Sequence, residues 1–309
     1  MSSAMRIRAL FPGQGSQTPG IGKALALAHP AAAACFDEAS QVLGLDMREL
    51  CWDSAPALLA QTQNAQPALL TASVAAWRVL GQSGVQLTAA AGHSVGAVAA
   101  LVAADSLPFA QAVRLLRLRG ELMASAPGEG GMCAIVATGE DRAAALVAVE
   151  RLGLDVAADN SPRQFVAAGE LAAVRALAAE LGARVKLLDV SHAFHSRLMT
   201  PVADQWAAAV QELDLTDATV PVGLVTTGGY STAAADLAKD LTAALCAPVH
   251  WQDLMTALGG QGEGPVAALG PAKALVSLAR HFPDRPALTL VDTPVSLAAF
   301  VRRLEAEDK

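Results

Sequence analysis

The stretch Leu87–Ala104 reads LTAAAGHSVGAVAALVAA. Its opening residues are mostly apolar and favour a buried strand, and its Ala- and Val-rich end favours a helix. Between them lies GHSVG, Gly92 to Gly96, whose two glycines permit a very sharp turn. A strand, a sharp turn and a helix around GxSxG are typical of a nucleophile elbow, which exposes a serine hydroxyl and directs free helix N–H groups at developing negative charge. The stretch therefore predicts an α/β fold in which Ser94 is a candidate nucleophile.

A serine nucleophile needs a general base, because its hydroxyl is unreactive at neutral pH, and histidine is the usual base. The chain has six histidines: His29, His93, His192, His195, His250 and His281. His93 adjoins Ser94, so we expect its side chain to leave the turn in another direction. His192 and His195 follow a predicted strand, where α/β enzymes place catalytic groups, so both are candidate bases. As a metal pair they lack an acidic or cysteine ligand at a suitable spacing, and no metal is expected.

Other predicted elements lie on both sides of the elbow. A strand over Arg6–Phe11 leads into Pro12-Gly13-Gln14-Gly15, a backbone that can turn tightly and approach a ligand. Periodicity and turn residues predict helices over Ala31–Val42, Pro67–Leu80, Phe109–Ala124, Ser196–Leu213, Ala233–Leu245, Trp251–Leu258 and Ala272–His281, and strands over Val220–Thr226 and Val266–Leu269.

A cluster of turn-forming residues, PGEGG from Pro127 to Gly131, marks a boundary. The pattern that follows is βαββαβ, the order of a ferredoxin-like unit. The expected elements are Met132–Ala137, Asp141–Leu152, Asp155–Ala158, Gln164–Ala168, Leu171–Leu181 and Val185–Val190. We therefore predict a small domain over residues 130–191, inserted between residues 1–129 and 192–309 of a large domain.

Composition excludes several classes of protein. The 309-residue chain carries a net charge of −7, which argues against nucleic-acid binding that rests on phosphate neutralisation. The most apolar stretch, Ala89–Ala104, is interrupted by His93 and Ser94 and falls short of the roughly 20 apolar residues of a membrane span. The N-terminal residues are not apolar enough for a signal peptide. Four scattered cysteines without a CxxC pair suggest reduced core residues, so we expect a cytoplasmic protein.

Eight short motifs occur along the chain in a recognisable order. They are FPGQGSQ (11–17), QNAQPALL (63–70), GHSVG (92–96), RLRGELM (117–123), DNSPRQFVAAG (159–169), HAFHSRLM (192–199), APVHW (247–251) and GPAKAL (270–275). On these motifs the chain resembles the malonyl-CoA:acyl carrier protein transacylases and the related discrete acyltransferases of polyketide synthesis. The resemblance implies an α/β-hydrolase-like large domain with an inserted ferredoxin-like small domain, which agrees with the division described above.

The resemblance also implies roles for particular residues. Ser94 would be the acylated nucleophile and His195 its base, oriented by a main-chain carbonyl from the segment Ala243–Cys246. The backbone N–H groups of Gln14 and Val95 would form the oxyanion hole. The expected substrate-binding residues are Arg119, which would hold the free carboxylate of the acyl group, together with Phe194, His192 and Asn160.

The implied reaction is ping-pong transfer of a malonyl group from malonyl-CoA to the phosphopantetheine thiol of an acyl carrier protein, through an ester on Ser94. No cofactor or metal is needed for it, and we expect a monomer that binds neither nucleic acid nor membrane. Three alternatives remain open: an acyl-thioester hydrolase, a trans-acting acyltransferase for a different acyl group in polyketide synthesis, and a catalytically silent docking module. A carboxylate-binding arginine would favour the transferase over a hydrolase of neutral acyl chains.

Overall fold

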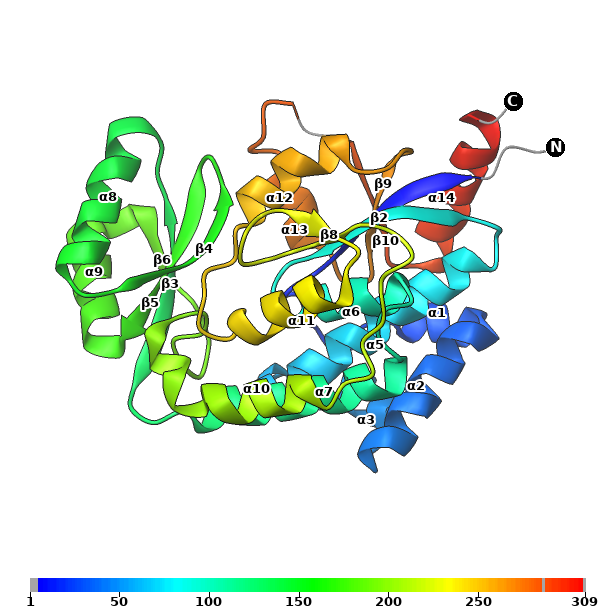
Figure 1. Cartoon of the computed structure of the whole chain (residues 1–309), viewed down its shortest axis with the longest axis horizontal. Coiled ribbons are helices and arrows are strands. Elements are labelled where there is room, and N and C mark those ends of the chain that lie inside the picture. The colour runs from blue at the N-terminus through cyan, green and yellow to red at the C-terminus, as the bar shows by residue number, and fades with distance from the viewer. Residues whose placement is uncertain (1–4, 285–286, 308–309) are drawn as a thin grey trace.

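Two β-sheets organise the protein (Figure 1), whose structure is a computed structural model that describes residues 5–284 and 287–307. The larger sheet has the strand order β10-β9-β1-β2-β7-β8 and the smaller sheet the order β4-β5-β3-β6. Strands of the larger sheet are β1 (Arg6–Phe11), β2 (Gln86–Gly92), β7 (Val222–Gly223), β8 (Tyr230–Ser231), β9 (Val266–Leu269) and β10 (Leu288–Val291). Strands of the smaller sheet are β3 (Gly130–Val136), β4 (Asp155–Ser161), β5 (Gln164–Glu170) and β6 (Val185–Leu187).

The larger sheet is parallel except for β8, which pairs antiparallel with β7. Strand β1 lies between β9 and β2, and its residues Ile7, Leu10 and Phe11 are fully buried. Phe11 pairs with Gly92, so the loops that follow β1 and β2 leave the same edge of the sheet side by side. The carboxyl edge of a parallel sheet is the usual place for a ligand site in α/β proteins.

Helices cover the larger sheet on both faces (Figure 1). They are α1 (Lys23–Ala28), α2 (Pro30–Leu43), α3 (Met47–Trp52), α4 (Pro56–Ala60), α5 (Thr62–Gly81), α6 (Gly96–Ala103), α7 (Phe109–Ser125), α10 (Ala203–Gln211), α11 (Ala234–Ala243), α12 (Trp251–Ala257), α13 (Lys273–Ala279) and α14 (Pro294–Glu307). Within the described ranges, no helix is long and apolar enough to cross a membrane.

The smaller sheet is antiparallel and carries α8 (Gly139–Arg151) and α9 (Leu171–Leu181), seen at the left of Figure 1. Its strand order and βαββαβ sequence are those of a ferredoxin-like unit. It has its own apolar core, centred on Ile135, Phe165 and Leu177. The expected fold class, a hydrolase-like α/β part with an inserted ferredoxin-like part, is confirmed.

Two predicted elements of the larger part are shorter than expected. The helix over Ser196–Leu213 is split into a 3₁₀ segment, Arg197–Val202, and α10, because Pro201 cannot donate a backbone hydrogen bond. The strand over Val220–Thr226 is only β7. The carboxylate of Asp240 accepts hydrogen bonds from the N–H groups of Val225 (2.9 Å) and Thr226 (2.8 Å), which turns the chain away from the sheet.

Other differences concern boundaries and missed elements. The strand over Val185–Val190 ends at Leu187. The helix expected to begin at Pro67 begins at Thr62. Because proline favours the first turn of a helix, the prediction placed the start too late in the sequence. The short helices α1, α3 and α4 and the elements β8, β10 and α14 had no prediction.

Candidate active site

The turn around Ser94 has the geometry of a nucleophile elbow. Ser94 has a φ of 51°, a left-handed conformation that costs energy for any residue with a Cβ. A Cβ on Gly92 would lie 1.9 Å from the carbonyl carbon of Gly96, and a Cβ on Gly96 would lie 2.3 Å from the carbonyl oxygen of Phe11. The turn therefore forms only with glycine at both positions, and it holds the serine at the carboxyl edge of the sheet.

His195 contacts this serine. Its Nε2 lies 2.7 Å from Ser94 Oγ, and its Nδ1 lies 3.2 Å from the carbonyl oxygen of Ala247. A carbonyl oxygen only accepts hydrogen bonds, so Nδ1 carries the proton and the unprotonated Nε2 faces the hydroxyl. The backbone of Ala244, inside the expected segment 243–246, and that of Ala247, just beyond it, both hydrogen-bond His195.

The surroundings of His195 keep its ring neutral. Burial lowers the pKa of His195 from 6.5 to about 3, and the positive charge of Arg119 acts in the same direction. A neutral imidazole with a free Nε2 can take the proton of the Ser94 hydroxyl. The pair is thus arranged for nucleophilic attack by Ser94.

Two backbone N–H groups beside Ser94 have no hydrogen-bond partner within the described residues. They belong to Gln14, after β1, and to Val95, at the N-terminus of α6. The parallel pairing of Phe11 with Gly92 brings these two loops together. Unpaired N–H groups next to a nucleophile can stabilise an oxyanion, so the expectation for Gln14 and Val95 stands as a proposal.

Arg119 lies on α7 with 3% of its surface exposed. It forms no ion pair among the described residues, and Glu121, the nearest acid in sequence, is held instead by Arg117 at 2.6 Å. After burial, its positive charge is the next cause that lowers the pKa of His195. Burial lowers the pKa of Arg119 to about 10, so it remains charged at neutral pH. A buried cation without an internal anion is suited to an anionic ligand.

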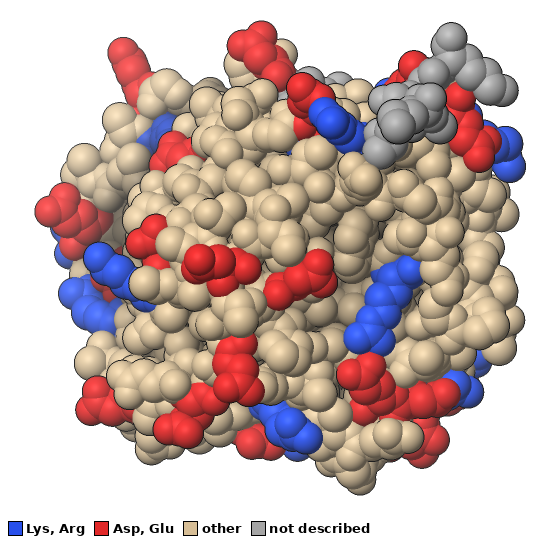
Figure 2. Space-filling model, turned by 45° about the vertical axis from the view of Figure 1, so that its right-hand side comes forward, with Lys and Arg blue, Asp and Glu red and all other residues tan. Residues whose placement is uncertain are grey.

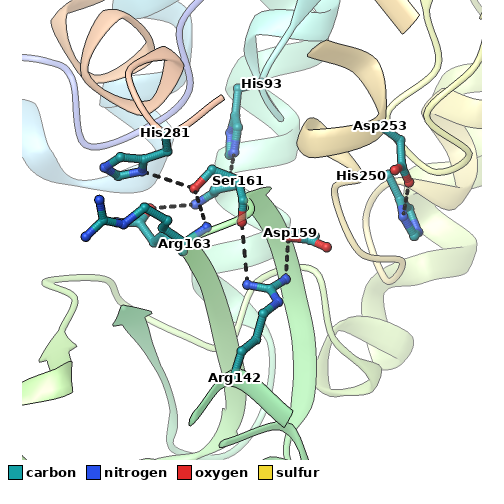
Figure 3. A network of polar contacts seen from close by, with 10 residues as sticks. His93, Arg142, Asp159, Ser161, Arg163, His250, Asp253 and His281 are labelled. Atoms are coloured by element: carbon teal, nitrogen blue, oxygen red, sulfur yellow. Dashed lines mark hydrogen bonds and ion pairs between the residues drawn. The ribbon is translucent and has the colours of Figure 1, made fainter. Parts of the chain in front are cut away.

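His93 points away from Ser94, as its position in the turn required. Its Nε2 lies 2.8 Å from Oδ1 of Asn160 on β4, and its ring packs against Trp251. Figure 3 shows His93 reaching toward the end of β4, where Ser161 contacts His281 and the main chain of Arg163. Asn160 therefore joins the smaller sheet to the elbow and helps shape the site from outside the reacting pair.

The ring nitrogens of His192 both contact the backbone. Its Nε2 lies 3.2 Å from the carbonyl oxygen of Pro127, and its Nδ1 accepts a hydrogen bond from the N–H of Ala193. These contacts favour a structural role for His192, and its expected substrate-binding role stays a prediction. Phe194 is 4% exposed within the main core, and its expected role in substrate binding stays a prediction.

The remaining histidines are outside the reacting pair. His250 contacts Asp253 (Figure 3), and His281 contacts Ser161. In the part of the chain that the structure describes, no group of three or more His, Cys, Asp or Glu side chains is placed to hold a metal ion.

The similarity of this chain to known proteins agrees with the geometry. A family model for the acyl transferase domain matches residues 10–278. The chain is 36% identical over 314 residues to the malonyl CoA-acyl carrier protein transacylase of Bacillus subtilis (strain 168), with 98% of each chain covered. The chain belongs to the malonyl-CoA:acyl carrier protein transacylase family.

Solved structures of this transacylase family share the whole fold. FabD from Acinetobacter baumannii is 33% identical with a TM-score of 0.91, over 99% of this chain and 100% of that one. A malonyl-transacylase solved in complex with a type II polyketide acyl-carrier protein is 34% identical with a TM-score of 0.90, over 96% and 99% of the two chains. The family thus includes relatives named for polyketide synthesis.

Sequence reasoning missed two residues that contact Arg119 in this transacylase fold. Gln66 Oε1 accepts a hydrogen bond from Arg119 Nη1 at 3.1 Å, and the ring of Trp206 lies 5.9 Å from the guanidinium carbon. Gln66 belongs to the QNAQPALL motif, which drew attention to the segment without assigning the glutamine a role.

Proposed function

We propose that this chain transfers a malonyl group from malonyl-CoA to the phosphopantetheine thiol of an acyl carrier protein, with Ser94 and His195 as its catalytic pair. The observation that carries the proposal is a buried Arg119 that forms no ion pair among the described residues and whose positive charge acts on His195 of the Ser–His pair. A carboxylate on the acyl group supplies the anion that Arg119 lacks, and the bidentate guanidinium geometry suits it.

The proposed reaction has two matched halves. His195 Nε2 takes the proton of the Ser94 hydroxyl while Oγ attacks the thioester carbonyl carbon, and the N–H groups of Gln14 and Val95 stabilise the resulting oxyanion. The C–S bond then breaks, and the proton on His195 passes to the departing CoA sulfur. The carrier-protein thiol enters, gives its proton to His195 and attacks the ester carbonyl carbon. The C–O bond to Ser94 then breaks, and His195 returns the proton to Oγ.

A cleft of about 360 Å³ is suited to deliver both thioesters. It lies between the two sheets and is lined by Gln14, His93 and Asn160 from the site, together with Lys186 and His281. Its walls combine apolar side chains with amide and hydroxyl groups, which suits an arm built of alkyl and amide units. CoA and carrier proteins present the same phosphopantetheine arm, so one cleft can serve both halves of the reaction.

The carrier protein needs cations on this acidic enzyme. Among the arginines and lysines that could supply this charge, three are already paired: Arg117 with Glu121, Arg184 with Asp141 and Arg197 with Asp155. Arg114 and Lys186 form no ion pair in the described part of the chain, and only Lys186 lines the cleft. Arg163 lies near the cleft, because its backbone N–H donates to the hydroxyl of Ser161, which in turn contacts His281 on the cleft wall. We assign the docking of the carrier protein to Lys186 and Arg163.

The remaining expectations follow from the same proposal. Thioester substrates and four free cysteines suit a reducing cytoplasm. That the protein is a monomer stays a prediction. An acyl-thioester hydrolase would use the same Ser–His pair, but a hydrolase of neutral acyl chains gains nothing from Arg119.

Intact-mass spectrometry tests the proposal. Incubation with malonyl-CoA should add one malonyl group to the protein, and a phosphopantetheinylated carrier protein should remove it and gain the same mass. Ser94→Ala should abolish the adduct, and both Ser94→Ala and His195→Ala should lose roughly 10³- to 10⁶-fold in rate. His192→Ala should lose far less, because its ring only holds backbone groups. An adduct that persists in Ser94→Ala, or release to water faster than to the carrier protein, would overturn the proposal.

A further inference from the structure

Arg119 is surrounded by neutral groups. Gln66, with no exposed surface, accepts one hydrogen bond from Nη1 of Arg119, and the buried ring of Trp206 lies near the guanidinium group. An amide oxygen and an aromatic face both attract a cation without cancelling its charge. The guanidinium group has five N–H donors, and Gln66 takes only one of them, so the others stay available to a ligand.

The amide of Gln66 is oriented by contacts on both sides. Its Nε2 donates to the sulfur of Met123 at 3.2 Å, while its Oε1 faces Arg119. A flipped amide would place an NH₂ group against the guanidinium group and lose both contacts. The oxygen is therefore held toward the cation.

Close packing of two helices places this amide beside Arg119. A Cβ on Gly120 of α7 would lie 2.4 Å from Cα of Gln63 on α5, so the helices cross at a distance that only glycine allows. Arg119 immediately precedes Gly120, and Gln66 follows Gln63 by one turn of helix, so the two side chains meet at the crossing although 53 positions separate them.

We propose that Gln66 is a specificity-determining positioning residue. Its amide oxygen, a neutral acceptor, fixes one edge of the Arg119 guanidinium group. The other edge is then free to receive the carboxylate of a dicarboxylic acyl group. This inference rests on the proposed malonyl transfer and names the residue that reserves the charge of Arg119 for substrate. A carboxylate at position 66 would pair with Arg119 and repel the carboxylate of the acyl group.

The test uses two variants of nearly the same size as glutamine. Gln66→Glu places a carboxylate beside Arg119, and Gln66→Met removes the acceptor without adding charge. Loading of the full-length enzyme by malonyl-CoA and by acetyl-CoA is measured for each, with kcat and KM determined separately. The readout is the ratio of malonyl to acetyl kcat/KM, because a general loss of folded enzyme lowers both rates and leaves the ratio unchanged. Thermal unfolding shows how much of each variant is folded.

Gln66→Glu should lower the malonyl-to-acetyl ratio by about 30-fold or more, mainly through a higher KM for malonyl-CoA. Gln66→Met should lower it by about 3- to 30-fold, because the cation loses its orientation but keeps its charge. Equal losses for both acyl groups, or an unchanged ratio in Gln66→Glu, would overturn the role of Gln66. A wild-type enzyme that does not load malonyl at all would instead overturn the proposed function.

Discussion

At the scale of single residues, the two members of the candidate catalytic pair share an unusual backbone. Ser94 and His195 have φ values of 51° and 57°, and among the described residues Asp105 is the only other non-glycine with a positive φ. Left-handed backbone at a residue with a Cβ costs of order 1 kcal/mol or more and persists only where the surrounding structure enforces it. Here this backbone is enforced by the glycines of the elbow, by the Ala247 carbonyl and by the 2.7 Å contact between the two side chains.

Arg119→Ala should separate the malonyl and acetyl reactions. Losing one partner of a buried charge pair typically costs about 2 to 5 kcal/mol, which corresponds to roughly 30- to 4,000-fold in malonyl transfer. Acetyl transfer should fall little or rise, because an acetyl group has no free carboxylate to bind and the buried uncompensated charge is gone. Loading rates with the two acyl-CoAs check this. Equal depression of both would mean that Arg119 supports the fold rather than the substrate.

The neutral state of His195 has a consequence for pH. Its pKa is lowered by burial to about 3 in the folded protein, against 6.5 without the fold, so the unfolded chain binds more protons between these values. Stability from this group is therefore fully present above about pH 6.5 and is lost as pH falls toward 3, by up to about 1.4 kcal/mol per pH unit. The rate of Ser94 acylation should not fall to half of its plateau value near pH 6.5, because the His195 ring stays neutral at that pH.

Urea denaturation at pH 7 and pH 5 checks the stability effect, with His195→Ala as the comparison. The wild type should lose more stability between the two pH values than the variant does. An identical loss in both, together with an acylation rate that halves near pH 6.5, would mean that His195 titrates as an ordinary exposed histidine.

At the scale of secondary structure, the elbow depends on how closely α6 approaches β1. A Cβ on Gly96, the first residue of α6, would lie 2.3 Å from the carbonyl oxygen of Phe11 and 2.7 Å from that of Pro12. Gly96→Ala should therefore push the helix away from β1, at a cost of about 1 to 3 kcal/mol or more, and displace Ser94 from His195. Melting temperature and malonyl loading should both fall.

Gly81→Ala is the matched control for this change. Gly81 ends α5, and a Cβ there would meet no atom within 4 Å. This variant should melt at or slightly above the wild-type temperature and load malonyl normally, because alanine favours helix more than glycine does. If Gly96→Ala behaved like Gly81→Ala, the close approach of α6 and β1 would not be needed for the site.

At the scale of the whole molecule, charge is dispersed. On the face shown in Figure 2, acidic and basic side chains are interspersed and separated by broad areas of other residues. With a net charge of −7, the protein cannot attract an acidic carrier protein by its overall field. Docking must therefore use local cations at the cleft, where the phosphopantetheine arm would enter.

The double variant Lys186→Glu with Arg163→Glu should raise the KM for the carrier protein by about three- to tenfold and change its salt dependence. The rate of loading from malonyl-CoA, measured without carrier protein, should fall by a smaller factor than the rate of transfer to the carrier protein. Arg302→Glu on α14 is a control for the change of surface charge, because α14 lies far from the smaller sheet (Figure 1). Equal losses in the two half-reactions would contradict a docking role.

Several features of the fold and site could be predicted from local sequence. The strand, turn and helix around Ser94, the βαββαβ order after Gly131 and the direction of the His93 side chain depend on residues only a few positions apart. Hydrophobic periodicity and the backbone freedom of glycine act at that range. The motifs that carry the family resemblance added the expectation of His195 and Arg119, which lie far from Ser94 in sequence.

Only the tertiary structure decided the contacts that make these residues a site. His195 meets Ser94 across 101 positions and takes its orientation from the carbonyl of Ala247, and His192 is turned instead to the backbone. Arg119 is left without an acid because Arg117 holds Glu121, and its neutral partner Gln66 comes from another helix. Such contacts depend on how closely α5, α6 and α7 pack against each other and the sheet, and no local pattern in the sequence specifies those distances.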